Sequence, residues 1–436
     1  MPRPAFSADG PPSMPLPRPR FLLPALILMC VVGAAAASLM PPRAAFHQAP
    51  LPNDIYVWQR AWTPALGQAM DLAAPDITAW RVLAAEVSAD GHIAPALLND
   101  GRLEALRAHL AGRPVILVVR IDGRLTEGDP APLVTTALAS LERWREAGVG
   151  VAGLEIDHDC PTARLPFYAR FLTDLRAQLK DRGLTGTRLS ITALPTWLPA
   201  PALAEVVAVP DEVVLQVHAV AAPTDGLFNP AQAARWIAAY ARRFHTPFRV
   251  ALPDYGARVS WNADDSLATV EGETPLLGGG AHANELMARP ADVAAFLKDL
   301  RAQAPANLTG VAWFRLPTAE DRRAWSLATW ATVARGGIPV GHLTAVTRPT
   351  ATPGLSTLVL VNDGAADAEL PSGLDLPTAC PLGDGANGYA RDPLAPQTAP
   401  RLVRLSPGLL HPGDQRSVGW VRCPDLPSSP VIHVRP

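Results

Sequence analysis

The sequence has little charge and no excess of either sign. Only 18% of its 436 residues are charged, and 38 Lys and Arg stand against 40 Asp and Glu. Nucleic-acid-binding proteins usually carry a strong basic excess, so this balance argues against a nucleic-acid partner. A hydrophobic content of 48% excludes wholesale disorder, and the length allows two or three domains.

Cysteine is scarce, and several common functional motifs are missing. The chain has 4 cysteines, no CxxC and no HExxH, so a structural metal is not expected. The Gly278-Gly279-Gly280 run lacks the Lys and the following helix of a P-loop, and no G-x-S-x-G elbow occurs. We therefore expect no cofactor.

The cysteines differ in their surroundings. Cys380 and Cys423 both lie in the last hundred residues, where an exported chain could oxidise them to a disulfide. Cys160 lies beside candidate catalytic carboxylates, which disfavour its thiolate and argue against a nucleophilic role.

The N-terminal segment predicts export. No charge occurs from Phe21 to Pro42, and Arg20 and Arg43 bracket this run. Its length could span a hydrocarbon core of ~30 Å, but a short apolar stretch followed by small residues is typical of a secretory signal. Residues 1–42 are thus predicted to be either a cleaved signal peptide or a membrane anchor. Both alternatives place the rest of the chain outside the cytoplasm, periplasmic or anchored to the inner membrane facing the periplasm, with membrane contact through this segment alone.

After a Pro-rich linker (43–53), residues 54–338 alternate β-rich runs with amphipathic helical runs. The predicted strands are 54–62, 80–87, 115–122, 151–159, 188–194, 212–220, 248–255 and 311–316. The predicted helices are 103–110, 133–147, 167–182, 230–244, 290–304 and 321–335. Eight β-then-α units fit an α/β fold of the (β/α)₈ TIM-barrel type. The rival, a doubly wound open sheet, usually has fewer strands.

Beyond Pro339 the pattern changes to short strands separated by Pro, Gly and Asp turns, at 344–348, 358–362 and 416–422. No helical period is present. Residues 340–436 are predicted to form a small all-β, sandwich-like domain.

The fourth predicted strand carries the most informative pattern. Because side chains alternate along a strand, Glu155, Asp157 and Asp159 share one face, and Leu154 and Ile156 share the other. Apolar residues pack against the helices, so the three carboxylates face the barrel interior. Burying them is costly unless they are paired or protonated, and mutual repulsion raises at least one pKa. A proton-bearing carboxyl suits general acid catalysis at a glycosidic oxygen. The alternative is a buried salt-bridge network with inward arginines such as Arg120 and Arg315.

The run Gly153-Leu154-Glu155-Ile156-Asp157-His158-Asp159 resembles the D-G-x-D-x-D-x-E signature of chitinase-like (family 18) glycoside hydrolases. The resemblance implies Asp159 as the general acid, Asp157 as the carboxylate that orients the substrate's N-acetyl group, and Glu155 as inner support. This chain differs at two positions, with Asp in place of the acid Glu and Glu in place of the first strand Asp.

A longer stretch, from about Asp54 to Gly337, is similar to a bacterial domain of unknown function, number 3142. The similar runs are Tyr56–Arg60, Leu189–Pro195, Val214–His218 and Trp313–Pro317. This resemblance implies the fold and says little about mechanism.

Other predicted strand ends supply substrate-binding candidates, because barrel active sites lie at the C-terminal ends of the strands. Sugar rings stack on aromatic side chains, which favours Trp58, Tyr255 and Trp313. The resemblance also implies polar contacts from the sixth strand and a Trp platform on the eighth. The full set of candidates is Trp58, Glu86, Arg120, Asp122, Gln216, His218, Tyr255, Trp313 and Arg315.

Together these patterns predict an exported barrel that binds or hydrolyses an envelope polysaccharide or glycoconjugate by carboxylate acid/base chemistry. A non-catalytic carbohydrate-binding barrel and an envelope scaffold remain as alternatives. The identity of the sugar and the oligomeric state are left open by the sequence.

Overall fold

The computed structural model describes residues 51–95, 102–125, 129–220, 226–272, 280–378, 380, 382–396, 400–423 and 432–435. The predicted signal or anchor lies outside these ranges, as do Gly278 and Gly279. Within the described ranges, none of the helices has the length and apolarity needed to cross a bilayer.

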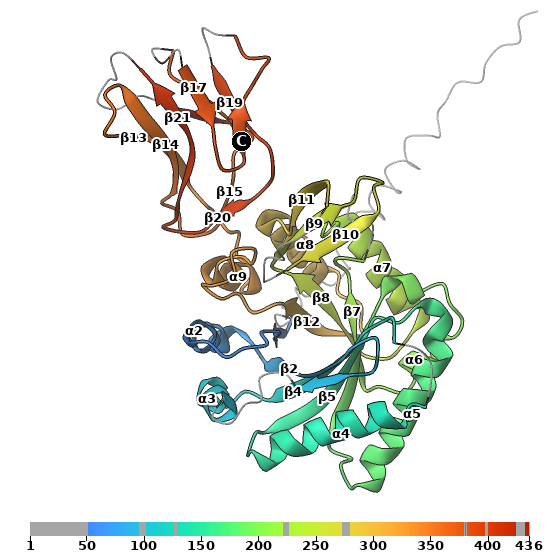
Figure 1. Cartoon of the computed structure of the whole chain (residues 1–436). Coiled ribbons are helices and arrows are strands. Elements are labelled where there is room, and N and C mark those ends of the chain that lie inside the picture. Colours follow the sequence, from blue (N-terminus) through green and yellow to red (C-terminus); the bar gives the residue numbers. More distant parts are fainter. Residues whose placement is uncertain are drawn as a thin grey trace, which may run out of the picture. The chain divides into compact units, whose positions relative to one another are not determined.

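Eight parallel strands form a closed barrel (Figure 1). They are β1 (Asn53–Val57), β2 (Ala79–Val87), β4 (Val115–Ile121), β5 (Val151–His158), β6 (Arg188–Ala193), β7 (Glu212–Gln216), β8 (Phe248–Pro253) and β12 (Leu308–Phe314). Each strand pairs with the next, and β1 closes the cylinder by pairing with both β2 and β12. This closure confirms the predicted TIM barrel over the open sheet.

Helices follow the strands and cover the outside of the barrel (Figure 1). They are α2 (Pro64–Ala73), α3 (Arg102–His109), α4 (Ala131–Glu146), α5 (Leu165–Asp181), α6 (Leu203–Val207), α7 (Pro230–Arg243), α8 (Pro290–Ala302) and α9 (Leu327–Ala334). Their starts follow local chemistry. Asn229 caps α7 by accepting from the Gln232 amide at 3.0 Å, directly before Pro230.

Two hydrophobic clusters separate the inside of the barrel from its outside. The larger cluster joins strand residues such as Leu154 and Ile156 to the helices. The smaller one fills the cylinder and includes Tyr56, Trp58 and Val118, with Phe314 packed against it. The barrel is thus a packed core whose interior residues come from alternate strand positions.

The chain departs from the prediction between Tyr255 and Pro290. The sequence analysis predicts no strand or helix in that segment, but it contains β9 (Gly256–Trp261), β10 (Leu267–Glu271) and β11 (His282–Met287). These strands form an antiparallel sheet with β9 in the centre. The short hairpin at the end of β2, with β3 (Ile93–Pro95), was also missed.

The C-terminal region is all β, as predicted. One sheet contains β13 (Leu343–Pro349), β14 (Leu355–Asn362), β21 (Gln415–Arg422) and β17 (Leu382–Gly385). A second contains β18 (Tyr389–Arg391), β19 (Arg401–Arg404), β16 (Gly373–Asp375) and β22 (His433–Arg435), and β15 (Ala368–Glu369) pairs with β20 (Leu409–Leu410). Leu358 of the first sheet and Leu402 of the second share one core.

A disulfide joins Cys380 to Cys423, as predicted, with a Cα–Cα distance of 4.1 Å. Both cysteines are buried in the core of the β-domain. The bond closes a large loop, which stabilises the folded state by constraining the unfolded chain.

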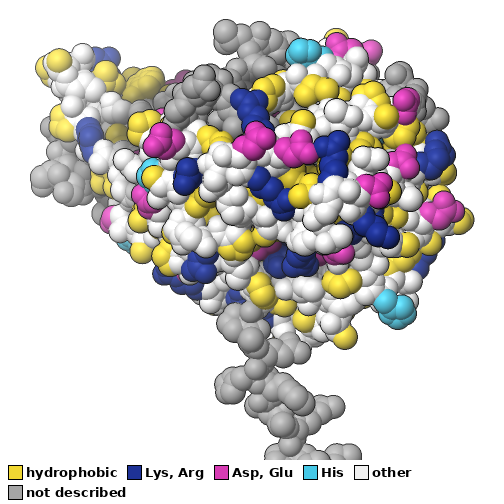
Figure 2. All heavy atoms as spheres, turned by 90° about the horizontal axis from the view of Figure 1, so that it is seen from below, with side chains coloured by type: hydrophobic (Ala, Val, Ile, Leu, Met, Phe, Trp, Pro, Cys, Tyr) yellow, Lys and Arg dark blue, Asp and Glu magenta, His cyan; other side chains and the backbone are white. Residues whose placement is uncertain are grey.

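The molecular surface agrees with the low, balanced charge. Figure 2 shows Lys and Arg side chains interspersed with Asp and Glu side chains on the face displayed. No broad basic area dominates that face.

Candidate functional site

The strand β5 delivers carboxylates to the inside of the barrel, as its alternation predicts. Glu155 lies opposite Val118 of β4 and Ser190 of β6, and Asp157 lies opposite Arg120 of β4. Glu155 is fully buried, Asp157 is 8% exposed, and Asp159 follows the end of the strand and is exposed. The three acids therefore rise from the packed core to the solvent at the barrel mouth.

The deepest acid, Glu155, belongs to a buried polar network. It accepts hydrogen bonds from the Tyr56 hydroxyl at 2.6 Å and the Ser190 hydroxyl at 2.9 Å, and it forms an ion pair with Arg81. Burial raises the pKa of Glu155, and Arg81 opposes that rise. Glu155 thus supports the site from below and is closed to a substrate.

Arg81 of β2 is the centre of this network, and the sequence analysis missed it. Its guanidinium also pairs with Asp54 of β1 at 3.0 Å and with Glu212 of β7 at 2.9 Å. Arg249 of β8 lies 3.2 Å from Asp54 and 3.1 Å from Glu212. The salt-bridge alternative is therefore correct for Glu155, but its partner is Arg81 and not Arg120 or Arg315. The sequence did contain a signal for this network, because four largely apolar strands each carry a charged residue. These residues are Asp54, Arg81, Glu212 and Arg249.

Asp157 is held between Arg120 and Thr192. The Thr192 hydroxyl donates to its Oδ1 at 2.5 Å. Burial and the neighbouring Asp159 raise the pKa of Asp157 to about 7, while Arg120 acts against them. The carboxyl of Asp157 therefore titrates near neutral pH.

Asp159 is the member of the group that solvent reaches. Desolvation raises its pKa, Asp122 adds to the rise, and Arg120 opposes it. The loop after β4 packs tightly against this residue, because a Cβ on Gly123 would lie 2.1 Å from the Asp159 carbonyl oxygen. Glycine at position 123 thus positions the backbone of Asp159, a role that the sequence analysis did not identify.

The remaining acids of the mouth are already paired. Glu86 of β2 lies opposite Arg120 in the strand register and accepts two hydrogen bonds from Arg60, at 2.6 and 2.7 Å. Asp122 accepts hydrogen bonds from Arg124, which lower its pKa to about 2. Asp122 is therefore ionised at neutral pH, and together with Glu86 it forms an acidic edge around Asp157 and Asp159.

Aromatic rings form the other side of the mouth. Trp58 packs edge-on against Phe314 with centroids 5.1 Å apart, and the Arg120 guanidinium lies 5.8 Å from the Trp58 ring. Phe314 also contacts Tyr255 at 5.5 Å and is partly exposed. The structure thus brings Trp58, Arg120, Tyr255 and Phe314 together. The side chains of Trp58 and Tyr255 are buried there, and that of Phe314 is partly exposed.

The expected position of Trp313 is wrong. This residue is fully buried on the outer side of β12, where it packs against Trp325 and Trp330 and its indole donates to Asn53 Oδ1 at 3.1 Å. Trp313 was expected at the mouth because it is an aromatic residue at the end of a predicted strand and because the resemblance implies a Trp platform there. Phe314, the next residue, lies at the mouth instead.

Arg315 is also unavailable to a substrate. It is 3% exposed, forms an ion pair with Asp321, and lies 5.4 Å from the Tyr255 ring centroid. Its charge stabilises the loop after β12 through Asp321.

His218 and Gln216 lie at the end of β7. His218 is buried, and its ring stacks on that of Phe314 with the ring centroids 5.8 Å apart. Its Nδ1 lies 3.4 Å from the Tyr255 hydroxyl oxygen. Burial lowers its pKa to about 3, so it is neutral at physiological pH. Gln216 is partly exposed and donates to the His218 carbonyl at 3.2 Å. Cys160 is buried and its pKa is raised to about 12 by burial, which excludes a ready nucleophile.

The chain is thus a (β/α)₈-barrel protein with an acidic and aromatic mouth and a C-terminal β-domain. Residues 111–319 match the domain of unknown function DUF3142, which confirms the resemblance over that range, and residues 345–424 match the domain of unknown function DUF8456. No curated protein matches the sequence.

Solved structures similar to this chain include chitinases and a spore enzyme. A chitinase from Chromobacterium violaceum is 14% identical with a TM-score of 0.45, covering 66% of this chain and 98% of its own. The spore cortex-lytic enzyme SleL from Bacillus cereus is 12% identical with a TM-score of 0.46, and the match covers 66% of this chain and 74% of the SleL chain. A GH18 chitinase variant from Cycas revoluta is 12% identical with a TM-score of 0.43, and the match covers 65% of this chain and 98% of the chitinase chain. The barrel itself is established by the strand pairing described above.

Proposed function

We propose that the barrel acts on an envelope polysaccharide or glycoconjugate as a glycoside hydrolase that uses carboxylate acid/base chemistry. One observation carries the proposal. Asp157 and Asp159 lie together at the mouth with raised pKa values, so a proton remains available at neutral pH. A glycosidic oxygen must receive a proton as its bond breaks, and a carboxyl with a pKa near the working pH supplies it best.

The geometry supports distinct roles for the two acids. Asp159 is exposed and is proposed as the general acid that contacts the leaving oxygen. Asp157 is nearly buried and hydrogen-bonded to Thr192, so it is proposed to orient the substrate. Burial and the charge of Asp159 raise its pKa, so the two carboxyls are proposed to share one proton near neutral pH. Phe314, which is partly exposed beside the buried Trp58, supplies a ring against which the apolar face of a sugar would pack.

The test is release of new reducing ends from purified envelope polysaccharides. The purified wild-type chain is compared with the double variant Asp157→Asn/Asp159→Asn and with Asp174→Asn, which changes an exposed acid on α5. We expect release by the wild type and by Asp174→Asn only. Equal release by all three proteins would contradict the proposal.

The pH dependence of that activity is a separate prediction. The proton shared by Asp157 and Asp159 is lost as pH rises through the pKa of about 7 of Asp157, so the rate should fall with a midpoint near that pH. Arg120 lowers the pKa values of both acids. Arg120→Gln should therefore move the alkaline limb of the kcat/KM profile to higher pH, and a shift to lower pH would contradict this assignment.

The second candidate is a non-catalytic carbohydrate-binding barrel. It is favoured by the short side chain of Asp159 at the position where the family resemblance expects Glu. Glycan binding by the wild type that survives Asp159→Asn, with no product released from any substrate, would support this alternative over hydrolysis.

We also propose that the chain is exported, to the periplasm or as a protein anchored to the inner membrane. The uncharged run from Phe21 to Pro42 supports this, as does the Cys380–Cys423 disulfide, because such bonds persist in oxidising compartments. Trapping free thiols in intact cells tests the proposal. Cys380 and Cys423 should resist alkylation unless a reductant is added, whereas free thiols at both positions would contradict export.

A further inference from the structure

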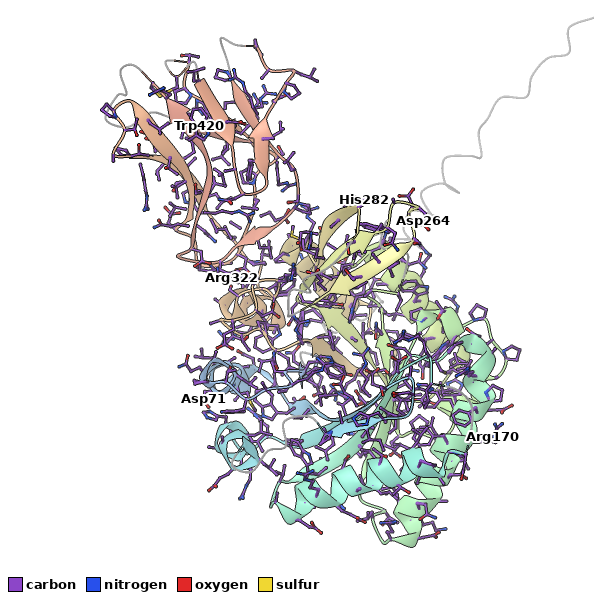
Figure 3. All side chains as sticks on the ribbon, viewed as in Figure 1. Asp71, Arg170, Asp264, His282, Arg322 and Trp420 are labelled. Atoms are coloured by element: carbon purple, nitrogen blue, oxygen red, sulfur yellow. A yellow bond between two sulfur atoms is a disulfide. The ribbon has the colours of Figure 1, made fainter. Side chains whose placement is uncertain are left out.

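One sheet of the β-domain presents an open face to solvent. In the strands β13, β14, β21 and β17, alternate residues such as Leu358 and Val421 point into the domain core. On the opposite face Trp420 is 39% exposed, and Figure 3 shows it within this domain. Leu382 of β17 is 51% exposed and lies on the same face, since its register partner Arg422 is two residues from Trp420. Exposed apolar side chains that share one face indicate an interaction site better than a single one does.

The residues beside Trp420 form a row across all four strands. The register pairs Arg348 of β13 with Thr357 of β14, Thr357 with Trp420 of β21, and Trp420 with Asp384 of β17. Directly paired residues share one face of a sheet, and all four are at least partly exposed. At ~4.8 Å between strands the row is about 14 Å long, which accommodates a short stretch of a sugar chain.

The face has a net positive charge. Arg422, two residues along β21 from Trp420, is exposed and forms no ion pair within the described residues, and Arg348 bonds only to Gln415 there. The single carboxylate of the row, Asp384, accepts from its own hairpin, from the Gly385 amide at 2.7 Å and the Arg391 amide at 3.3 Å. The Arg422 guanidinium is therefore available to a ligand, and that of Arg348 becomes available when it releases Gln415.

We propose that this face binds an acidic polysaccharide. The Trp420 indole packs against the apolar face of a sugar ring, while Arg348 and Arg422 bind carboxylates carried by neighbouring sugars. Arginine recognises a carboxylate through two parallel hydrogen bonds, and aromatic rings pack well on apolar ring surfaces. Charge complementarity thus selects an anionic glycan over a neutral one. The proposal does not depend on the barrel being a hydrolase.

Affinity electrophoresis of the full chain tests this inference, in native gels containing polygalacturonate, neutral dextran or no polysaccharide. We expect retardation by polygalacturonate alone. Trp420→Ala should weaken the apparent affinity about 10-fold, equivalent to about 1.4 kcal/mol, and Trp420→Tyr should keep most of it. Leu405→Ala is the matched control, since it removes another exposed apolar side chain of the β-domain.

The arginines give a second readout. The double variant Arg348→Gln/Arg422→Gln should bind more weakly, and its binding should depend less on salt. Equal retardation by dextran, or unchanged binding by Trp420→Ala, would overturn the proposal. A dimer in sedimentation that Trp420→Ala dissociates would also overturn it, because the face would then bind a second copy. The variant Asp159→Asn should be retarded like the wild type, so failure of the hydrolase proposal is distinguishable from failure of this one.

Discussion

Asparagine in place of Asp159 is expected to lower kcat/KM on a cleaved glycan by about 10²- to 10⁴-fold, the usual contribution of a general acid. The amide occupies nearly the same volume but cannot release a proton to the leaving oxygen. The measurement is initial-rate kinetics of reducing-end release at pH 6, below the pKa of about 7 of the neighbouring Asp157, where the wild-type pair holds its proton.

Two comparisons make this result specific. Substrate affinity, measured by binding to the same glycan, should change little in Asp159→Asn, because the variant removes a step of the reaction and leaves the aromatic contacts of Trp58 and Phe314 in place. Thermal unfolding should match the wild type, since Asp159 is exposed and bears no structural ion pair in the described residues. A loss of less than about 5-fold in kcat/KM would show that a group other than Asp159 is the general acid.

Methionine in place of Arg81 should destabilise the barrel by about 3–5 kcal/mol. Arg81 is fully buried and pairs with Asp54, Glu155 and Glu212. Its removal leaves three buried carboxylates near one another, with Arg249 beside Asp54 and Glu212 and the exposed Arg188 beside Glu212 to compensate. Urea unfolding followed by tryptophan fluorescence gives the value, because several buried indoles report on the barrel.

A double-mutant cycle separates the ion pair from simple loss of volume. Glu155→Gln removes one of the stranded charges, so the variant Arg81→Met/Glu155→Gln should be less destabilised than the sum of the single changes. Arg81→Lys should also be less stable than the wild type. The planar guanidinium of arginine binds three carboxylates on separate strands, and the compact ammonium group of lysine cannot reach all three. An Arg81→Met protein within about 1 kcal/mol of the wild type would show that the network contributes little.

The acids of β5 were predictable because they depend on a local rule. Side chains alternate along a strand, so the positions of Leu154 and Ile156 in the helix-facing core determine that Glu155 and Asp157 face inward. The barrel was predictable for a related reason, since eight repeats of strand and helix have few ways to bury their apolar faces.

On β12, the alternation of side chains alone did not show which residues face the barrel interior. The rule needs at least one residue whose side of the sheet is already known. The run from Trp313 to Arg315 has bulky side chains at every position, so hydrophobicity alone does not distinguish the inner face from the outer one. Packing decides it. Trp313 fits between β12 and α9 against Trp330, and Phe314 fills the space beside Trp58.

The amino-acid sequence by itself therefore determined the barrel, the all-β C-terminal region, the disulfide and the inward ladder of acids, since each follows from local periodicity or a small choice of partners. Only the tertiary structure decided which charges neutralise one another. Arg81, Glu155 and Glu212 lie far apart in the chain and meet because the barrel closes. It also decided that Trp420 shares a row with Arg348, since strand register between distant segments depends on how two sheets bury their common core.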